Sequence, residues 1–193
     1  IIAGLPHENI DSFAGTFNYA AALKPDMLQL GFLKVLGGTE MKRFADSNGG
    51  YIYSDYPPYE IWQTPDMSFD DISILKRIEE LVDRYYNSGR YASLFNTLAG
   101  RGGLFEFFRA LAEWIESSKD KMRLYKPEDE GRFLYDYLLS LDDKIAVELF
   151  KYGFMSSFKV SFDNPHWMRR NYDKENHRRM LSDYLHSNPS KNK

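Results

Sequence analysis

The sequence predicts an α+β protein that is mainly helical, in which a short strand–helix–strand–helix unit precedes an aromatic-rich helical domain. In the first 47 residues, apolar runs too short for typical helices alternate with helical stretches. Beyond residue 68, apolar residues recur at spacings of three and four, as on one face of a helix. Phe, Tyr and Trp make up 16% of the 193 residues. So many rings require a packed interior, which excludes a wholly disordered chain.

The first 47 residues read as two strands, each followed by a helix. Apolar runs at Ile1–Leu5 and Met27–Val35 predict the strands, and Thr39 is a good N-cap for the second helix. The helices are expected over 10–23 and 40–45. Because a helix joins the two strands, we expect the strands to be parallel, as in a fragment of an α/β sheet or barrel.

Residues 48–67 form a junction of different composition. Gly49-Gly50, Pro57-Pro58 and Pro65 flank two short aromatic runs, Tyr51–Tyr53 and Tyr59–Trp62. This texture predicts either a hairpin or an extended arm. We interpret Tyr56-Pro57-Pro58-Tyr59 as a stiff connector whose tyrosines pack against the domain; the alternative is a polyproline-type ligand for a recognition domain.

Residues 68–165 are predicted to be helical. Ser68 caps a first helix, which ends at the C′ glycine Gly89. A loop at 100–103 precedes the clearest amphipathic pattern, which starts at Leu104. The remaining helices are expected over 91–98, from Pro127 as the first helical residue, and from Asp142-Asp143 to about Met155.

The C-terminal tail, 166–193, is basic. It carries seven Lys or Arg against three acids, a net +4, which leaves −7 for the preceding 165 residues. The difference suggests that the tail lies on its own domain or met a partner. Its aromatic and arginine residues could hold single-stranded nucleic acid, but the net charge of −3 argues against that partner, and we interpret the tail as a docked amphipathic helix.

Cysteine is absent, which excludes disulfides, thiolate nucleophiles, cysteine-ligated zinc and any iron–sulfur cluster held by this segment alone. The absence fits a reducing compartment, and we predict a cytoplasmic location. No apolar run approaches the roughly 18 residues that span a bilayer, so no membrane partner is expected.

No complete catalytic set is visible. The four histidines lack the spacing of a helical zinc motif, and no Gly-x-Ser-x-Gly nucleophile turn occurs. Of four groups of adjacent acids, three open a predicted helix, where negative charge complements the free N–H groups; Glu79-Glu80 is the exception. We interpret Gly37-Gly38-Thr39 as a turn and cap, although such N–H groups could also cradle an anion.

Several ordered segments resemble radical S-adenosylmethionine (SAM) enzymes. Ile1–Glu8 is similar to the IxGLPGE run on the fifth barrel strand, with His7 where the family has glycine, and Leu23–Asp26 precedes a sixth strand. Leu28–Leu36 looks like the cobalamin-binding branch, whose members carry a C-terminal helical domain of unknown function. Tyr56–Glu60 and Tyr85–Gly89 resemble landmarks of that domain.

The resemblance implies an iron–sulfur oxidoreductase that holds a 4Fe–4S cluster, SAM and cobalamin. By carry-over, Ile2 and Gly4 would face the adenine side of SAM, and Gln29 and Gly31 would line the adjoining wall. Residues 1–47 would then be the last two strands and helices of a radical SAM barrel. The cluster cysteines and the cobalamin domain would lie upstream of Ile1.

The chain begins Ile-Ile within an apolar run, which predicts a C-terminal fragment that is inactive alone and whose partner is the remainder of its own chain. Exposed strand edges predict self-association through the N-terminal region. The alternative is a non-catalytic helical interaction module that keeps a sheet remnant for stability.

Overall fold

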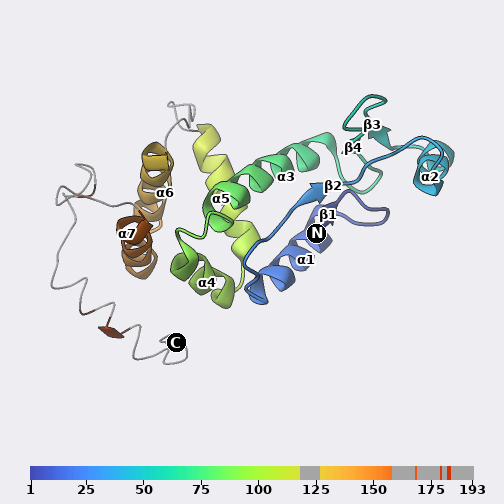
Figure 1. Cartoon of the computed structure of the whole chain (residues 1–193). Coiled ribbons are helices and arrows are strands. Elements are labelled where there is room, and N and C mark those ends of the chain that lie inside the picture. Colours follow the sequence, from blue (N-terminus) through green and yellow to red (C-terminus); the bar gives the residue numbers. More distant parts are fainter. Residues whose placement is uncertain (118–126, 158–167, 169–178, 180–181, 184–193) are drawn as a thin grey trace.

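The computed structural model describes residues 1–117, 127–157, 168, 179, 182 and 183. Within these residues it has seven α-helices and four short strands, which confirms the mainly helical class (Figure 1). None of the described helices combines the length and apolar character needed to cross a membrane. The predicted basic tail lies outside the described residues, except for residues 168, 179, 182 and 183.

The two N-terminal strands are parallel, as predicted. Strand β1 (Ile2–Ala3) pairs with β2 (Gly31–Phe32), with Ile2 opposite Gly31 and Ala3 opposite Phe32. Helix α1 (Ile10–Ala22) connects them. The strand expected over 27–35 is correct in place but too long, because its two ends bind partners other than β1, as described below.

The junction is a hairpin that binds the end of β2. Strands β3 (Ile52–Tyr53) and β4 (Ile61–Gln63) are antiparallel, with an irregularity in register. The Ile61 N–H donates to the Leu33 carbonyl, and the Val35 N–H donates to the Tyr59 carbonyl, both at 2.9 Å. The Leu33 N–H also donates to the Ala3 carbonyl at 2.9 Å, so these bonds use the edge of β2 that pairs with β1. Strand β4 therefore follows β1 along the same edge of β2.

One face of the β2 segment is buried and the other is open. Leu28, Leu30 and Phe32 are all at least nine-tenths buried, whereas Gln29 is exposed and Gly31 is half-buried. This alternation is the period of two expected of a strand with one face against a core. The apolar positions therefore anchor the strand and turn the alternate positions away from the core.

The helical part begins at α3 (Phe69–Leu81), where Ser68 and Asp71 form a capping box. Helix α3 continues into a π-helical turn, η1 (Val82–Tyr86). Helix α4 (Ala92–Arg101) includes residues 100 and 101, so the loop predicted over 100–103 is wrong in its first half. The other helices are α2 (Glu40–Asn48), α4 (Ala92–Arg101), α5 (Leu104–Ser117), α6 (Pro127–Ser140) and α7 (Lys144–Ser157).

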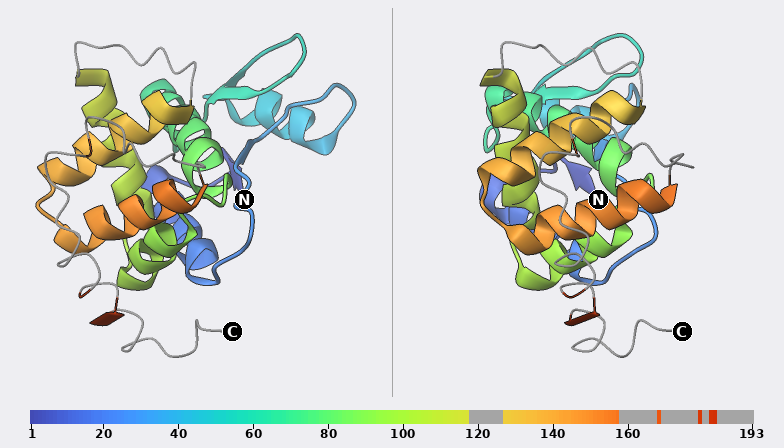
Figure 2. Two further views of the ribbon diagram at one scale, coloured as in Figure 1. Left: turned by 60° about the vertical axis from the view of Figure 1, so that its left-hand side comes forward. Right: turned by 90° about the vertical axis from the view of Figure 1, so that its left-hand side faces the viewer.

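The elements follow one another along the molecule from α6 and α7 at one end to α2 and the hairpin at the other (Figures 1 and 2). Between them, α5 packs on both α1 and α3. Phe13 and Phe17 of α1 meet Phe105 edge to face, with ring centroids 6.1 and 5.6 Å apart. Aromatic packing thus joins the strand–helix unit to the helical domain in one core.

At the far end, α7 packs closely on α4. The rings of Tyr91 and Phe150 stack with centroids 5.0 Å apart. A Cβ on Gly153 would lie 2.5 Å from the Arg90 carbonyl oxygen, so this close approach requires glycine.

Candidate functional site

A cavity of about 650 Å³ lies where the beginning of the parallel strand pair faces the end of α3. The strand segments supply one part of its lining and the helical domain supplies the other. Its lining residues are Ile1, Ile2, Leu28, Gln29, Leu30, Gly31, Glu79, Glu80, Asp83 and Asn87.

The strand side of the cavity contains three of the four residues that the resemblance singled out. Ile2 is 51% exposed, Gln29 is exposed, and Gly31 lies opposite Ile2 in the strand pair. A Cβ on Gly31 would meet only the Ile1 carbonyl oxygen, at 4.0 Å. Packing within this chain therefore does not require glycine at position 31, and its missing side chain leaves room in the cavity.

Gly4, the fourth of these residues, does not line the cavity. Its φ is +84°, which favours glycine, and an added Cβ would lie 2.8 Å from Cγ2 of the fully buried Ile61. The structure therefore gives Gly4 a packing role against β4.

The helical side of the cavity is acidic. Glu79, Glu80 and Asp83 all line it. Burial raises the pKa of the Glu79 carboxyl; nearby Lys76 lowers it, and Glu60, Glu80 and Asp83 raise it further. Among the described residues, no group of His, Asp or Glu is arranged to hold a metal ion. Sequence reasoning did not place these acids in a site, although Glu79-Glu80 was the one acidic group away from a helix start.

Asn87 ties the helical domain to the strand. The Leu28 N–H donates to Asn87 Oδ1 at 2.8 Å, and Asn87 Nδ2 donates to the Leu28 carbonyl at 3.1 Å. Next to it, the Tyr86 hydroxyl donates to the Pro25 carbonyl at 2.9 Å. The segment Tyr85–Gly89, noted in the sequence as a landmark, is thus a joint between the two parts.

A second hollow, of about 430 Å³, adjoins the first. It shares Ile1, Leu28 and Gln29 with the larger cavity and is otherwise lined by Ala20, Leu23, Pro25 and Met27. The side chains of Leu23 and Met27 are more than half exposed. This side of the strand pair therefore presents apolar surface to solvent.

In the segment Tyr56–Glu60, the Glu60 side chain is held by an ion pair and the Tyr56 side chain is exposed. Glu60 accepts a hydrogen bond from Lys76 Nζ at 2.5 Å, and the same ammonium lies 4.0 Å from the centroid of the Phe32 ring. Tyr56 is 79% exposed, so the expectation that both tyrosines of this connector pack down is wrong for Tyr56. Water can satisfy the hydrogen bonds of the Tyr56 hydroxyl, so this side chain does not need to pack against the domain.

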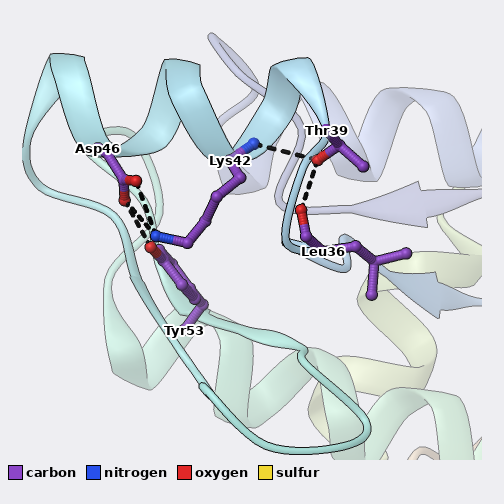
Figure 3. A network of polar contacts seen from close by, with 5 residues as sticks. All are labelled: Leu36, Thr39, Lys42, Asp46 and Tyr53. Atoms are coloured by element: carbon purple, nitrogen blue, oxygen red, sulfur yellow. Dashed lines mark hydrogen bonds and ion pairs between the residues drawn. The ribbon is translucent and has the colours of Figure 1, made fainter.

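Figure 3 shows the polar contacts that fix α2. Thr39 caps the helix as predicted: its hydroxyl accepts the Lys42 N–H at 3.2 Å and donates to the Leu36 carbonyl at 2.7 Å. Lys42 and the Tyr53 hydroxyl both donate to the Asp46 carboxylate, which lowers the pKa of Asp46. These contacts join α2 to the hairpin and account for Gly37-Gly38-Thr39 as a turn and cap.

Residues 48–192 match the sequence model of DUF4080, a family of proteins of unknown function. The chain belongs to this family. The DUF4080 match begins at the junction, so it covers the hairpin and the helical domain and leaves β1, α1, β2 and most of α2 outside. Comparison with curated proteins and with solved structures finds no match.

Proposed function

We propose that this chain is the C-terminal portion of a radical SAM iron–sulfur oxidoreductase or transferase that uses SAM and cobalamin. In this proposal β1 and β2 are the last two strands of the barrel, and the cavity at their open face is part of the SAM site. The DUF4080 part binds both ends of the last strand. The chain alone carries too little of the site to be active.

The observation that supports the proposal best is the open face of the parallel strand pair. Ile2, Gln29 and Gly31 were singled out from a resemblance in sequence, and all three line one cavity. A closed barrel requires residues that alternate between a helix-covered face and an inner face. The burial of Leu28, Leu30 and Phe32 against the exposure of Gln29 is that pattern.

The residues fit SAM in part and do not fit the cluster. An exposed isoleucine and an unfilled glycine offer a flat apolar contact for adenine, and the Gln29 amide offers a donor and an acceptor for its edge. SAM supplies the radical chemistry when it is bound beside a reduced cluster. Since the 193 residues contain no cysteine, a 4Fe–4S cluster would be held by residues outside this chain.

The DUF4080 part has a mechanical role in this proposal. The hairpin binds the end of β2 through Leu33 and Val35, and Asn87 binds its beginning through Leu28. The Asn87 contact lies on the edge of β2 opposite β1, and the hairpin contact continues the edge along which β1 pairs. Backbone groups left unpaired at either edge would be open to other chains. The DUF4080 part thus holds both ends of β2, and its helical domain also supplies the acidic side of the cavity.

The test is to express the full open reading frame that contains this sequence, reconstitute it anaerobically with iron and sulfide, and add SAM and a reductant. We expect the spectrum of a 4Fe–4S cluster and the release of 5′-deoxyadenosine. Gly31→Val should weaken SAM binding at least about tenfold, because its side chain would occupy the cavity. Gly37→Val is the matched control, since a Cβ there meets none of the described residues within 4 Å and Gly37 lies outside the cavity.

Two outcomes would contradict the proposal. One is an open reading frame without a Cys-x3-Cys-x2-Cys run upstream of Ile1; the other is a full protein that binds neither cluster nor SAM. Either outcome favours the alternative, a non-catalytic helical interaction module. Equal effects of Gly31→Val and Gly37→Val on SAM binding would place the site away from this cavity.

A further inference from the structure

We propose that Asn87, a residue of the DUF4080 part, is a positioning residue that fixes the strand bearing Gln29 and Gly31. Its amide takes the place of a neighbouring strand at the beginning of β2. What the positioned residues bind rests on the proposed function, but the role of Asn87 in holding the strand does not.

The hydrogen bonds of Asn87 imitate those of a paired strand. In an antiparallel ladder, one residue gives its N–H and its carbonyl to a single opposite residue. Leu28 does the same with the Asn87 side chain, at 2.8 and 3.1 Å. Only Asn and Gln side chains pair a neutral donor and acceptor in an amide. Because Leu28 is 4% exposed, its backbone groups have little access to water and require such partners.

The π-helical turn sets the direction of the Asn87 side chain. The Asn87 N–H donates to the Val82 carbonyl at 2.9 Å, five residues back instead of four. One extra residue in a turn rotates everything after it by about 100° relative to a continuous α-helix. That rotation accompanies the contacts of both Tyr86 and Asn87 with the segment that leads into β2.

Holding Leu28 fixes which side chains face the cavity. Gln29 follows Leu28 directly, and Gly31 lies two residues further on the same face. A slip of one residue would turn Gln29 and Gly31 toward the core and place Leu28 and Leu30 in the cavity. The strand pair itself is short, with two paired residues on each side, so the bonds of the Asn87 amide add to the buried face in holding this register.

Asn18 provides a matched control. It is also an asparagine that joins the strand–helix unit to the helical domain: its Oδ1 accepts the Phe105 N–H at 2.8 Å and its Nδ2 donates to Glu106 at 3.0 Å. It does not line the cavity. Replacing either residue by alanine removes two hydrogen bonds between the two parts, so the loss of global stability should be similar.

The experiment measures hydrogen exchange of the 193-residue chain by mass spectrometry, together with urea unfolding. We expect Asn87→Ala to raise exchange of the segment 25–31 about tenfold, the effect of losing roughly one buried hydrogen bond. Asn18→Ala should leave this segment within about twofold of the parent chain at equal global stability. If Asn87→Ala does not fold, Asn87→Ser and Asn18→Ser are the pair to measure, with the same difference in exchange at 25–31 expected.

A second readout uses the full protein and SAM. Asn87→Ala should raise the Kd for SAM about tenfold, and Asn18→Ala less than about threefold. Exchange at 25–31 that is equal in Asn87→Ala and Asn18→Ala would overturn the positioning role. If exchange responds as expected but the parent protein does not bind SAM, the positioning role stands and the proposed function fails.

Discussion

Replacing Gly4 by alanine should destabilise this protein far more than the same change at Gly31. At Gly4 the φ of +84° is unfavourable for any residue with a Cβ, at a cost of about 1–2 kcal/mol. The new Cβ would also lie 2.8 Å from Cγ2 of Ile61, which is fully buried, and overpacking of this kind costs about 1–3 kcal/mol. The lower entropy of the unfolded alanine chain offsets about 0.4–1 kcal/mol. The expected net loss for Gly4→Ala is therefore about 2–4 kcal/mol.

Urea unfolding followed by tryptophan fluorescence measures this loss, and Trp62 on β4 lies directly after Ile61. Gly31→Ala is the control and should change stability by less than about 0.5 kcal/mol, since its Cβ meets one atom at 4.0 Å. A double-mutant cycle separates the two causes at Gly4. Ile61→Ala removes Cγ2, so Gly4→Ala in that background should cost only the backbone strain, with a coupling of about 1–3 kcal/mol.

Equal effects of Gly4→Ala and Gly31→Ala on stability would contradict this prediction. If Gly4→Ala is costly but shows no coupling to Ile61→Ala, the cost comes from the backbone alone and the contact with Ile61 has no part in it. The comparison of Gly4 with Gly31 also shows which of the two glycines leaves space in the cavity. Gly4 and Gly31 share one sequence resemblance, yet only Gly31 has the free space that a ligand could use.

Three further predictions concern the helical domain. Ser68→Ala removes the acceptor for the Asp71 N–H, at 3.1 Å, and should cost about 1 kcal/mol of unfolding free energy in urea. Gly153→Ala forces a Cβ toward the Arg90 carbonyl and should cost about 1–3 kcal/mol, with the loss seen as a lower thermal midpoint. The raised pKa of Glu79 means that the folded state holds more protons than the unfolded state above the ordinary value of 4.5, so this carboxyl lowers stability as pH rises from 4.5 toward 7. Glu79→Gln should therefore stabilise the protein at pH 7 and have little effect near pH 4.5; an equal gain at both pH values would contradict the assignment.

Local signals in the sequence predicted most elements. Ser68 and Thr39 are good N-caps, and both cap the helices expected of them. The parallel strand pair followed from two apolar runs separated by a helix. The limits of the strand over 27–35 could not be predicted in the same way, because they depend on Asn87 and Tyr59, which are distant in sequence. The π-helical turn is equally invisible, since Val82–Tyr86 continues the apolar spacing of α3 without a break.

The site was only half predictable for the same reason. Ile2, Gln29 and Gly31 lie on strands, where a local pattern and a family resemblance indicate the face that they share. Glu79 and Asp83 reach the cavity because the packing of α3 on α5, together with the bonds of Asn87, places the end of α3 beside β2. Only the tertiary packing brings these acids to the strand residues.

The sheet contacts also limit which strand edge a second chain can bind. Exposed strand edges were expected to recruit other chains. In the structure the hairpin binds β2 at Leu33, on the same edge as β1, and Asn87 binds the opposite edge at Leu28. Among the described strands, none pairs with the other side of β1. A further strand, from a second copy or, under the proposed function, from the rest of the protein, would therefore bind beside β1, where Ile2 faces the cavity and apolar Leu23 and Met27 lie exposed nearby. The partner that completes the sheet would then also complete the cavity wall, so that sheet closure and ligand binding at this site depend on the same contact.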